Sequence, residues 1–214
     1  MRYTSLLDHL LSELDTALRT LLPPSKRGSA RSYPAQNIAE SGALTPQEKK
    51  HIAGLMRVNH AGEVCAQALY QGQALTAQLT HIKQQMNQAA AEEIEHLAWC
   101  EQRLQELGSQ PSILNFFWYG CSLLLGALAG IAGDKVSLGF VAETERQVTA
   151  HLHHHLNQLP AYDQRSQAIL QQMQEDETQH ATAAIDAGGI ELPYPIKQLM
   201  SMISKLMTKS SYYI

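Results

Sequence analysis

Proline and glycine are scarce in this chain of 214 residues, with 8 and 13 copies, and they gather in a few places. The long stretches between them are rich in Ala, Leu, Gln and Glu, which favour helices. No strand-like alternation is long enough to build a sheet, and no repeat of solenoid length occurs. These absences exclude a β or repeat architecture and predict an all-helical protein.

Cysteine pairs, a basic excess and an export signal are also missing. Three single cysteines without a CxxC pair favour a reducing compartment. A net charge of −4 and a pI of about 6.2 argue against a nucleic-acid partner. Asp8, Glu13 and Asp15 interrupt the first apolar run, which excludes a secretory signal. With 44% hydrophobic residues, the length suits one domain with a full core.

Turn signals divide the chain into segments. Leucines spaced by three and four predict an amphipathic helix over 3–22, followed by an irregular linker, so we treat residues 1–44 as separate from a domain of residues 45–214. Within that domain, Thr45-Pro46-Gln47-Glu48 is typical of a helix start. We expect four helices and a short amphipathic tail after Pro195; the helices should cover about 45–78, 82–107, 134–159 and 163–188.

Three Glu-x-x-His triplets occur, where the composition predicts fewer than one by chance: Glu48/His51, Glu93/His96 and Glu177/His180. Residues three apart share one face of a helix, so each pair can hold an ion from one side. A dinuclear site in a four-helix bundle takes two such pairs and one lone glutamate from each of the other helices. Glu63 and Glu145 are the natural candidates for the lone glutamates.

The distance of each glutamate from the turn of its hairpin, measured along the helix, supports one shared site. Glu63 and Glu93 each lie 15 residues from Gln78, at the first expected turn. Glu145 and Glu177 each lie 16 residues from residue 161, at the second. At the rise of an α-helix, these separations are roughly 22 and 24 Å. Two hairpins therefore bring their carboxylates to nearly the same level.

The ligand chemistry indicates the metal. Four carboxylates and two imidazoles form an oxygen-rich set that suits iron or manganese and disfavours a thiolate zinc site. Four glutamates would neutralise two divalent cations, and without them their burial would be costly. The acids beside these ligands are expected on solvated helix faces: Glu92, Glu95, Glu143 and Glu175.

Three histidines outside the ligand set have other expected roles. The Glu48/His51 pair lies roughly 18 to 22 Å along the helix from Glu63, so Glu48 is better explained as a capping residue. His60 lies one turn before Glu63, and His151 follows the lone glutamate of its own helix by six residues. Each is a candidate to orient a ligand from behind.

Four motifs together resemble the bacterial branch of the demethoxyubiquinol hydroxylase family: RVNHAGEVCAQALYQGQ (57–73), AEEIEHLAWCEQRLQELG (91–108), GDKVSLGFVAETERQVTAHL (133–152) and EDETQHATAAIDAGG (175–189). The resemblance covers residues 45–214 and implies a ferritin-like four-helix bundle with a di-iron centre. It places His151 close to the site, and Cys65 departs from the small residue expected there. The ligands that it implies are Glu63, Glu93, His96, Glu145, Glu177 and His180, with Glu93 and Glu177 bridging the two irons.

The activity that the resemblance implies is a monooxygenase reaction of ubiquinone synthesis. In the penultimate step, O₂ hydroxylates the ring of a polyprenylated methoxy-methyl-benzoquinol. The electron donor stays open, as does assembly with further copies or with other ubiquinone-synthesis proteins. Three alternatives are an iron-storage or peroxide-scavenging protein, a di-iron hydroxylase acting on modified tRNA, and a metal-free membrane-associated scaffold.

Residues 113–133 form an uncharged segment of 21 residues, ILNFFWYGCSLLLGALAGIAG, long enough to cross a bilayer. The resemblance instead implies a long apolar crossover helix, because a membrane span would separate the ligands. It would rest on the cytoplasmic face of the bacterial inner membrane as a peripheral contact, and burial against the bundle or a subunit partner is the alternative. The side chains expected to face the bilayer are Phe116, Phe117, Trp118, Leu123, Leu124 and Leu125.

Overall fold

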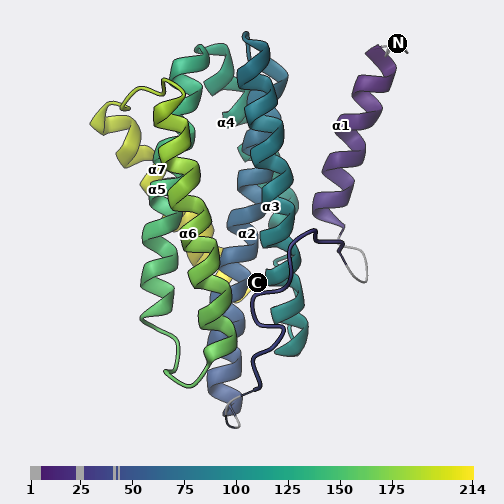
Figure 1. Cartoon of the computed structure of the whole chain (residues 1–214), viewed down its shortest axis with the longest axis vertical. Helices are drawn as coiled ribbons and strands as arrows, with labels where there is room; N and C mark the ends of the chain where they lie inside the picture. The colour runs from purple at the N-terminus through teal and green to yellow at the C-terminus, as the bar shows by residue number, and fades with distance from the viewer. Residues whose placement is uncertain (1–5, 23–26, 41, 43) are drawn as a thin grey trace.

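The computed structural model describes residues 6–22, 27–40, 42 and 44–214 (Figure 1). These residues contain α-helices and no strand, as the composition predicts. The helices are α1 (Leu6–Leu21), α2 (Pro46–Thr76), α3 (Thr80–Glu106), α4 (Asn115–Ile131), α5 (Asp134–Leu156), α6 (Gln164–Asp186) and α7 (Tyr194–Tyr213).

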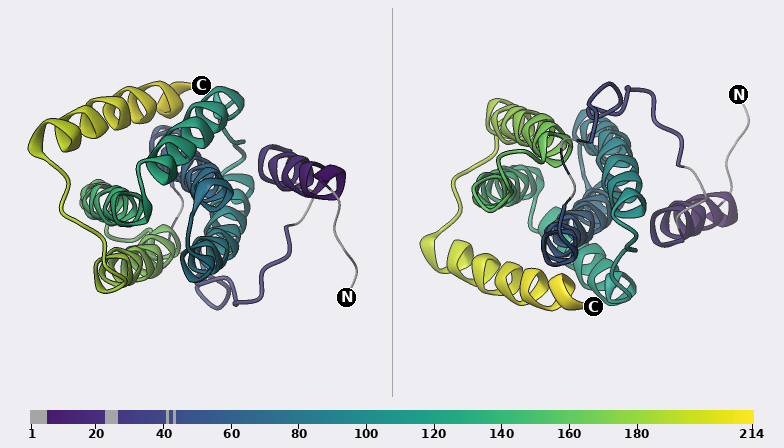
Figure 2. Two further views of the ribbon diagram at one scale, coloured as in Figure 1. Left: turned by 90° about the horizontal axis from the view of Figure 1, so that it is seen from above. Right: turned by 90° about the horizontal axis from the view of Figure 1, so that it is seen from below.

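Helices α2, α3, α5 and α6 form the predicted four-helix bundle, seen end-on in Figure 2. The first hairpin turns at residues 77–79 and the second at residues 157–163, where the sequence placed the turns. At the start of α2, Thr45 accepts a hydrogen bond from the Glu48 N–H, and Glu48 accepts one from the Thr45 N–H. The structural role predicted for Glu48 is therefore confirmed.

Helix α4 lies along α2 and runs in the same direction. Gly72 of α2 packs on the α4 backbone at Leu123, and one turn further Thr76 packs on Gly130. The chain thus returns along the bundle, so that α3 and α5 run the same way. The helix covers 17 residues, fewer than the 21 of the uncharged segment.

Two apolar clusters fill the bundle, one on each side of its middle. Ile52, Trp99, Leu152 and Ile169 belong to one cluster, to which each of the four helices contributes. The other cluster draws on the same helices at their opposite ends, with Tyr70, Met86, Leu138 and Ala184 among its members. The candidate ligands fall between the two clusters in every helix, so they form a polar layer inside the apolar core.

The C-terminal segment is longer than the short tail that the sequence predicts. Helix α7 has 20 residues and crosses the outside of the bundle (Figure 2). The Tyr212 hydroxyl contacts His51 Nδ1 at 2.6 Å, and Arg57 donates to the Tyr212 carbonyl at 2.7 Å, which fixes the end of α7 on α2. Among the described helices, none has both the length and the hydropathy that a membrane span requires.

The close contact between α2 and α4 predicts opposite effects for two glycines of α4. A Cβ at Gly126 would lie 2.2 Å from the Leu69 carbonyl oxygen, whereas a Cβ at Gly120 would meet nothing within 4 Å. Gly126→Ala should therefore lower the free energy of unfolding by about 1–3 kcal/mol. Gly120→Ala should raise it by about 0.5–1 kcal/mol, since alanine is the better helix former. Urea unfolding of both variants tests this, and equal effects would contradict the packing.

Candidate metal centre

The polar layer is built around two histidines that point their Nδ1 atoms inward. His96 Nδ1 lies 3.0 Å from Glu177 Oε1, 3.4 Å from Glu93 Oε2 and 3.5 Å from Glu63 Oε2. His180 Nδ1 lies 3.1 Å from Glu177 Oε2 and 3.5 Å from Glu93 Oε1. Glu93 and Glu177 therefore each offer one oxygen to each histidine.

Glu145 completes the layer from α5. Its carboxyl group accepts a hydrogen bond from the buried Tyr70 hydroxyl, and the charges of Glu177 and Glu93 act on it. Ligand atoms of Glu63, Glu93, His96 and Glu177 all lie within 4.8 Å of one another. The structure thus brings together all six residues that the spacing selected.

Two further carboxylates hold the histidines from behind, each from the opposite helix. His96 Nε2 on α3 donates to Asp176 Oδ2 on α6 at 2.9 Å. His180 Nε2 on α6 donates to Glu92 Oε2 on α3 at 2.6 Å. The expectation of a purely solvated face was wrong for Glu92 and also for Glu143, which is only 9% exposed. The sequence signal for these contacts is that an acid directly precedes the glutamate of each of the two Glu-x-x-His triplets in the layer.

Burial and charge shift the pKa values of the layer in a consistent way. Burial, with the charge of Glu177, raises the pKa of Glu93 and Glu145 well above the usual range of a carboxyl group. Burial also acts on Glu177, but His180 and His96 outweigh it and lower the pKa of Glu177 to about 2. Burial opposes a charged His180, yet the surrounding carboxylates raise the pKa of His180 to about 9. Protons therefore compensate the packed carboxylates in the absence of cations.

The donor set fits metal ions. Five of its buried atoms have no hydrogen-bond partner: both oxygens of Glu93, His96 Nδ1, Glu145 Oε2 and Glu177 Oε1. Buried polar atoms are rarely left unpaired in proteins, so a ligand for them is expected. Divalent cations would coordinate these atoms and neutralise the carboxylates, and oxygen and imidazole donors suit iron or manganese.

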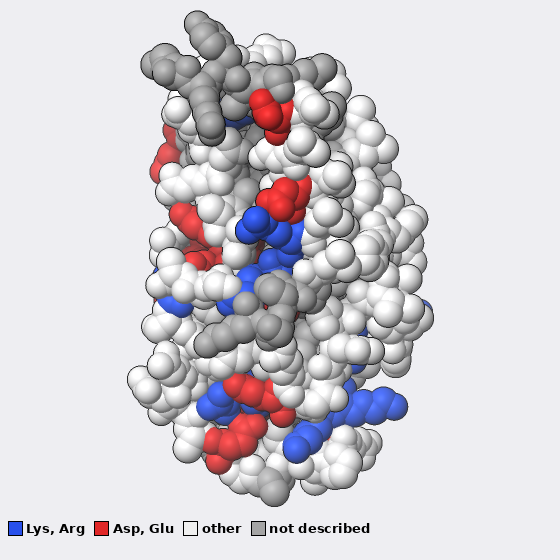
Figure 3. Space-filling view, turned by 90° about the vertical axis from the view of Figure 1, so that its right-hand side faces the viewer, with Lys and Arg blue, Asp and Glu red and all other residues white. Residues whose placement is uncertain are grey.

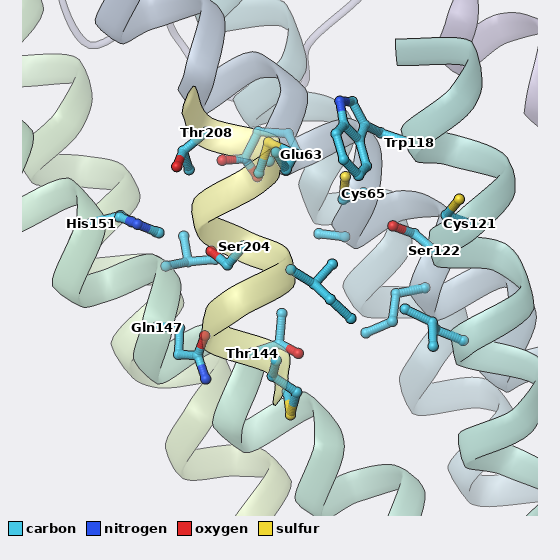
Figure 4. Close-up of a pocket in the computed structure, with 18 of the residues that line it drawn as sticks. Glu63, Cys65, Trp118, Cys121, Ser122, Thr144, Gln147, His151, Ser204 and Thr208 are labelled. Carbon is cyan, nitrogen blue, oxygen red and sulfur yellow. The ribbon is translucent and has the colours of Figure 1, made fainter. Parts of the chain in front are cut away.

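An apolar pocket leads from the surface to this layer. It lies between α2, α4, α5 and α7, and together with its open mouth it encloses about 1160 Å³ (Figure 4). Of the six candidate ligands, Glu63 lines the pocket, and Cys65, Trp118 and His151 form parts of the wall around it. Burial raises the pKa of the Cys65 thiol to about 11, so this side chain is a neutral part of the wall.

Comparison with known proteins identifies the family of this chain. Residues 50–211 match the family described as ubiquinone biosynthesis protein COQ7. The chain belongs to the COQ7 family. A 3-demethoxyubiquinol 3-hydroxylase from Legionella pneumophila (strain Paris) is 70% identical over 214 residues, and the match covers 100% of both chains. A protein of the same name from Acinetobacter baumannii (strain SDF) is 58% identical over the same full length. The resemblance seen in the four motifs is confirmed.

The roles expected of His60 and His151 beside the ligands of this COQ7 protein stay predictions. His60 Nε2 lies 3.3 Å from Glu101 Oε1, and its Nδ1 lies 3.2 Å from the Asn115 amide nitrogen. His60 lies one turn before Glu63 on α2, and these two hydrogen-bond partners come from α3 and α4. His151, six residues after Glu145 on α5, lines the same pocket as Glu63.

The structure also divides the side chains expected to face a bilayer. Phe116, Phe117 and Leu124 are exposed, the last two by 60% and 61%. The expectation was wrong for Trp118, which is 7% exposed and lines the pocket. Leu123 and Leu125 are partly buried, the former against an apolar cluster and the latter in the pocket wall.

The raised pKa values predict that metal binding displaces protons. The raised pKa values of Glu93, Glu145 and both histidines favour their protonated forms, and each group must lose a proton to coordinate a cation. The affinity for Mn(II) should therefore rise from about pH 6 to about pH 8, and it should level off only near the pKa of His180. Calorimetry in two buffers of different ionisation enthalpy should show more than one proton released per chain. An affinity that is independent of pH would contradict this charge state.

Proposed function

We propose that this chain is an O₂-dependent di-iron monooxygenase that hydroxylates the ring of demethoxyubiquinol in the penultimate step of ubiquinone synthesis. The observation that carries the proposal is the buried layer of four glutamates and two histidines at the inner end of an apolar pocket. Family membership and the name of the relatives that are 58% and 70% identical support the same reaction.

The six side chains of the layer are arranged for two cations. The paired oxygens of Glu93 and Glu177, each facing a different histidine, suit carboxylates that bridge two ions. Glu63 lies beside His96 and would serve one ion, and Glu145 on the opposite helix pair is available to the other. Two bound iron ions would supply the reduction of O₂, and the protein residues set their position.

The pocket matches the shape and polarity of a prenylated ring. Apolar side chains such as Leu199, Met200 and Ile203 of α7 form much of its wall, which suits an isoprenoid tail. The inner end reaches Glu63, so a ring that enters head first would stop beside the ligands. Exclusion of water by these walls would direct oxygen into the ring C–H bond rather than into side reactions.

The reaction needs electrons that the residues of the chain do not supply. One oxygen atom of O₂ enters the ring C–H bond, and the other leaves as water. Two electrons and two protons are therefore consumed in each turnover, and the quinol or an external donor must supply them.

A peripheral membrane contact would deliver this substrate. Residues of α4 and α7 line the pocket, and both helices also expose large apolar side chains, among them Phe117, Leu124, Met202 and Leu206. Contiguous exposed apolar surface of this kind is typical of interfacial helices. The cytoplasmic face of the inner membrane is the side that we assign to this contact.

The alternative functions do not explain the pocket. An iron-storage or peroxide-scavenging protein would use a similar layer but needs no apolar pocket that ends at a ligand. Modified tRNA would require a basic surface, which a net charge of −4 does not favour. A metal-free scaffold would leave five buried polar atoms of the layer without partners.

The membrane contact predicts a selective loss of vesicle binding. Phe117→Glu combined with Leu124→Glu places two charges on the exposed face of α4 and should reduce cosedimentation with anionic phospholipid vesicles severalfold. Leu18→Glu is the control, because Leu18 is 47% exposed on α1, away from the pocket. Metal content should stay unchanged in both proteins. Equal vesicle binding by the α4 variant and the wild type would contradict the contact.

A mutation of the layer tests the reaction itself. Glu177→Ala removes a ligand of both ions, and a strain that relies on this variant should accumulate the demethoxy precursor of ubiquinone, detected by mass spectrometry. Glu175→Ala changes an exposed glutamate on the same helix and should sustain normal ubiquinone levels. Retained ubiquinone synthesis by Glu177→Ala would refute the proposed function.

A further inference from the structure

The described part of the N-terminal segment, residues 27–40, lies against the bundle rather than apart from it (Figure 1). Arg27 donates to both oxygens of Glu101 on α3 at 2.8 to 3.1 Å, and these side chains are only 6% and 7% exposed. At the other end of the segment, Glu40 accepts a hydrogen bond from the buried Arg103 at 3.0 Å. The segment is therefore held across α3 at two points.

Arg31 of this segment reaches the metal layer through a single intermediate residue. Its guanidinium lies 2.7 Å from Asp176 Oδ2, the same oxygen that accepts from His96 Nε2 at 2.9 Å. The guanidinium also stacks 4.7 Å above the ring of Trp99, whose own ring lies beside His96. The backbone N–H of Arg31 donates to Glu95 at 3.1 Å, which fixes where the side chain begins.

The charged groups on this face of the protein are shown in Figure 3, where acidic and basic side chains lie next to one another. The corresponding carboxylate on the other half of the layer has a different setting. Glu92 accepts from His180 but forms no ion pair with a lysine or arginine among the described residues, and its side chain is 44% exposed. Among the described residues, the direct ion pair with Arg31 is therefore on the His96 half, whereas the charge of Arg31 acts on Glu92 without such a pair.

We propose that Arg31 is a positioning residue for the metal centre, acting on His96 through Asp176. The planar guanidinium fixes the Asp176 carboxylate in one orientation. That carboxylate then holds the His96 ring with its Nε2–H turned outward and its Nδ1 lone pair turned toward the cation. The N-terminal segment thereby contributes to a site whose ligands all lie outside it, an inference that rests on the proposed metal function.

A purely structural role makes a different prediction. If Arg31 only fastens the segment to the bundle, then Arg27, which is more deeply buried in a similar ion pair, should matter at least as much. If Arg31 positions His96, only the change at Arg31 should alter the metal centre. Arg27→Gln is therefore the matched control for Arg31→Gln.

Co(II) titration of the full chain separates these cases. Arg31→Gln should weaken one of two binding steps by about 3- to 10-fold, below the roughly 10- to 100-fold typical of groups that touch a ligand directly. In the Co(II)-loaded protein, one paramagnetically shifted imidazole N–H signal should exchange faster with solvent. Arg31→Lys keeps the charge, so its Co(II) affinity and exchange rate should lie between those of the wild type and of Arg31→Gln. Arg27→Gln should retain both Co(II) binding steps and both exchange rates of the wild type.

Further variants test whether Arg31 acts through Asp176. In an Asp176→Asn background, Arg31→Gln should have no additional effect, because the contact through which it acts is already lost. Arg31→Met serves if the glutamine variant fails to fold, as judged by thermal unfolding, and should show the same loss. Unchanged Co(II) binding and exchange in the Arg31 variants would overturn the inference, as would an equal change in Arg27→Gln. Failure of the wild type to bind Co(II) would instead contradict the proposed function.

Discussion

Four carboxyl groups buried between two apolar clusters are the constraint on which the rest of this structure depends. In a dry interior, four glutamates cannot all be charged without compensation. Burial and neighbouring charge raise the pKa of Glu93 and Glu145, which favours their neutral forms, and bound cations would displace these protons. The fold therefore keeps a group of donors together whose own repulsion would otherwise drive them apart.

The bundle opposes that repulsion by packing on both sides of the layer. Each helix contributes to one apolar cluster above the ligands and another below them. The histidine rings are held from behind by carboxylates that cross from α3 to α6 and from α6 to α3. These reciprocal contacts join α3 and α6, the two helices whose Glu-x-x-His triplets belong to the layer. They also make the layer a product of the whole bundle rather than of one hairpin.

The four helices and the six candidate ligands could be predicted because the number of residues between a glutamate and its turn fixes the distance of that glutamate along the bundle axis. Glu63, Glu93, Glu145 and Glu177 had to meet once two turns were placed, since the rise per residue is fixed. Helix rotation was harder to predict. The uncharged sequence of α4 has apolar residues on every side, so no periodicity shows that Trp118 turns inward while Phe117 turns outward.

Contacts between segments that are far apart in the sequence could not be predicted, because they also depend on how the helices are rotated. Asp176 and Glu92 support histidines on the opposite helix, and the pairing depends on how α3 and α6 face each other. Arg31 lies in an irregular segment whose path no local pattern specifies. The amphipathic sequence after Pro195 indicates a helix, but only the packed structure shows that α7 closes one side of the pocket.

The most direct measurement is anomalous scattering at the iron absorption edge from crystals grown anaerobically with Fe(II). The account predicts two peaks within the polar layer, one beside His96 and one beside His180, with Glu93 and Glu177 contacting both. A single peak outside the layer, or six side chains that turn away from any bound iron, would contradict it.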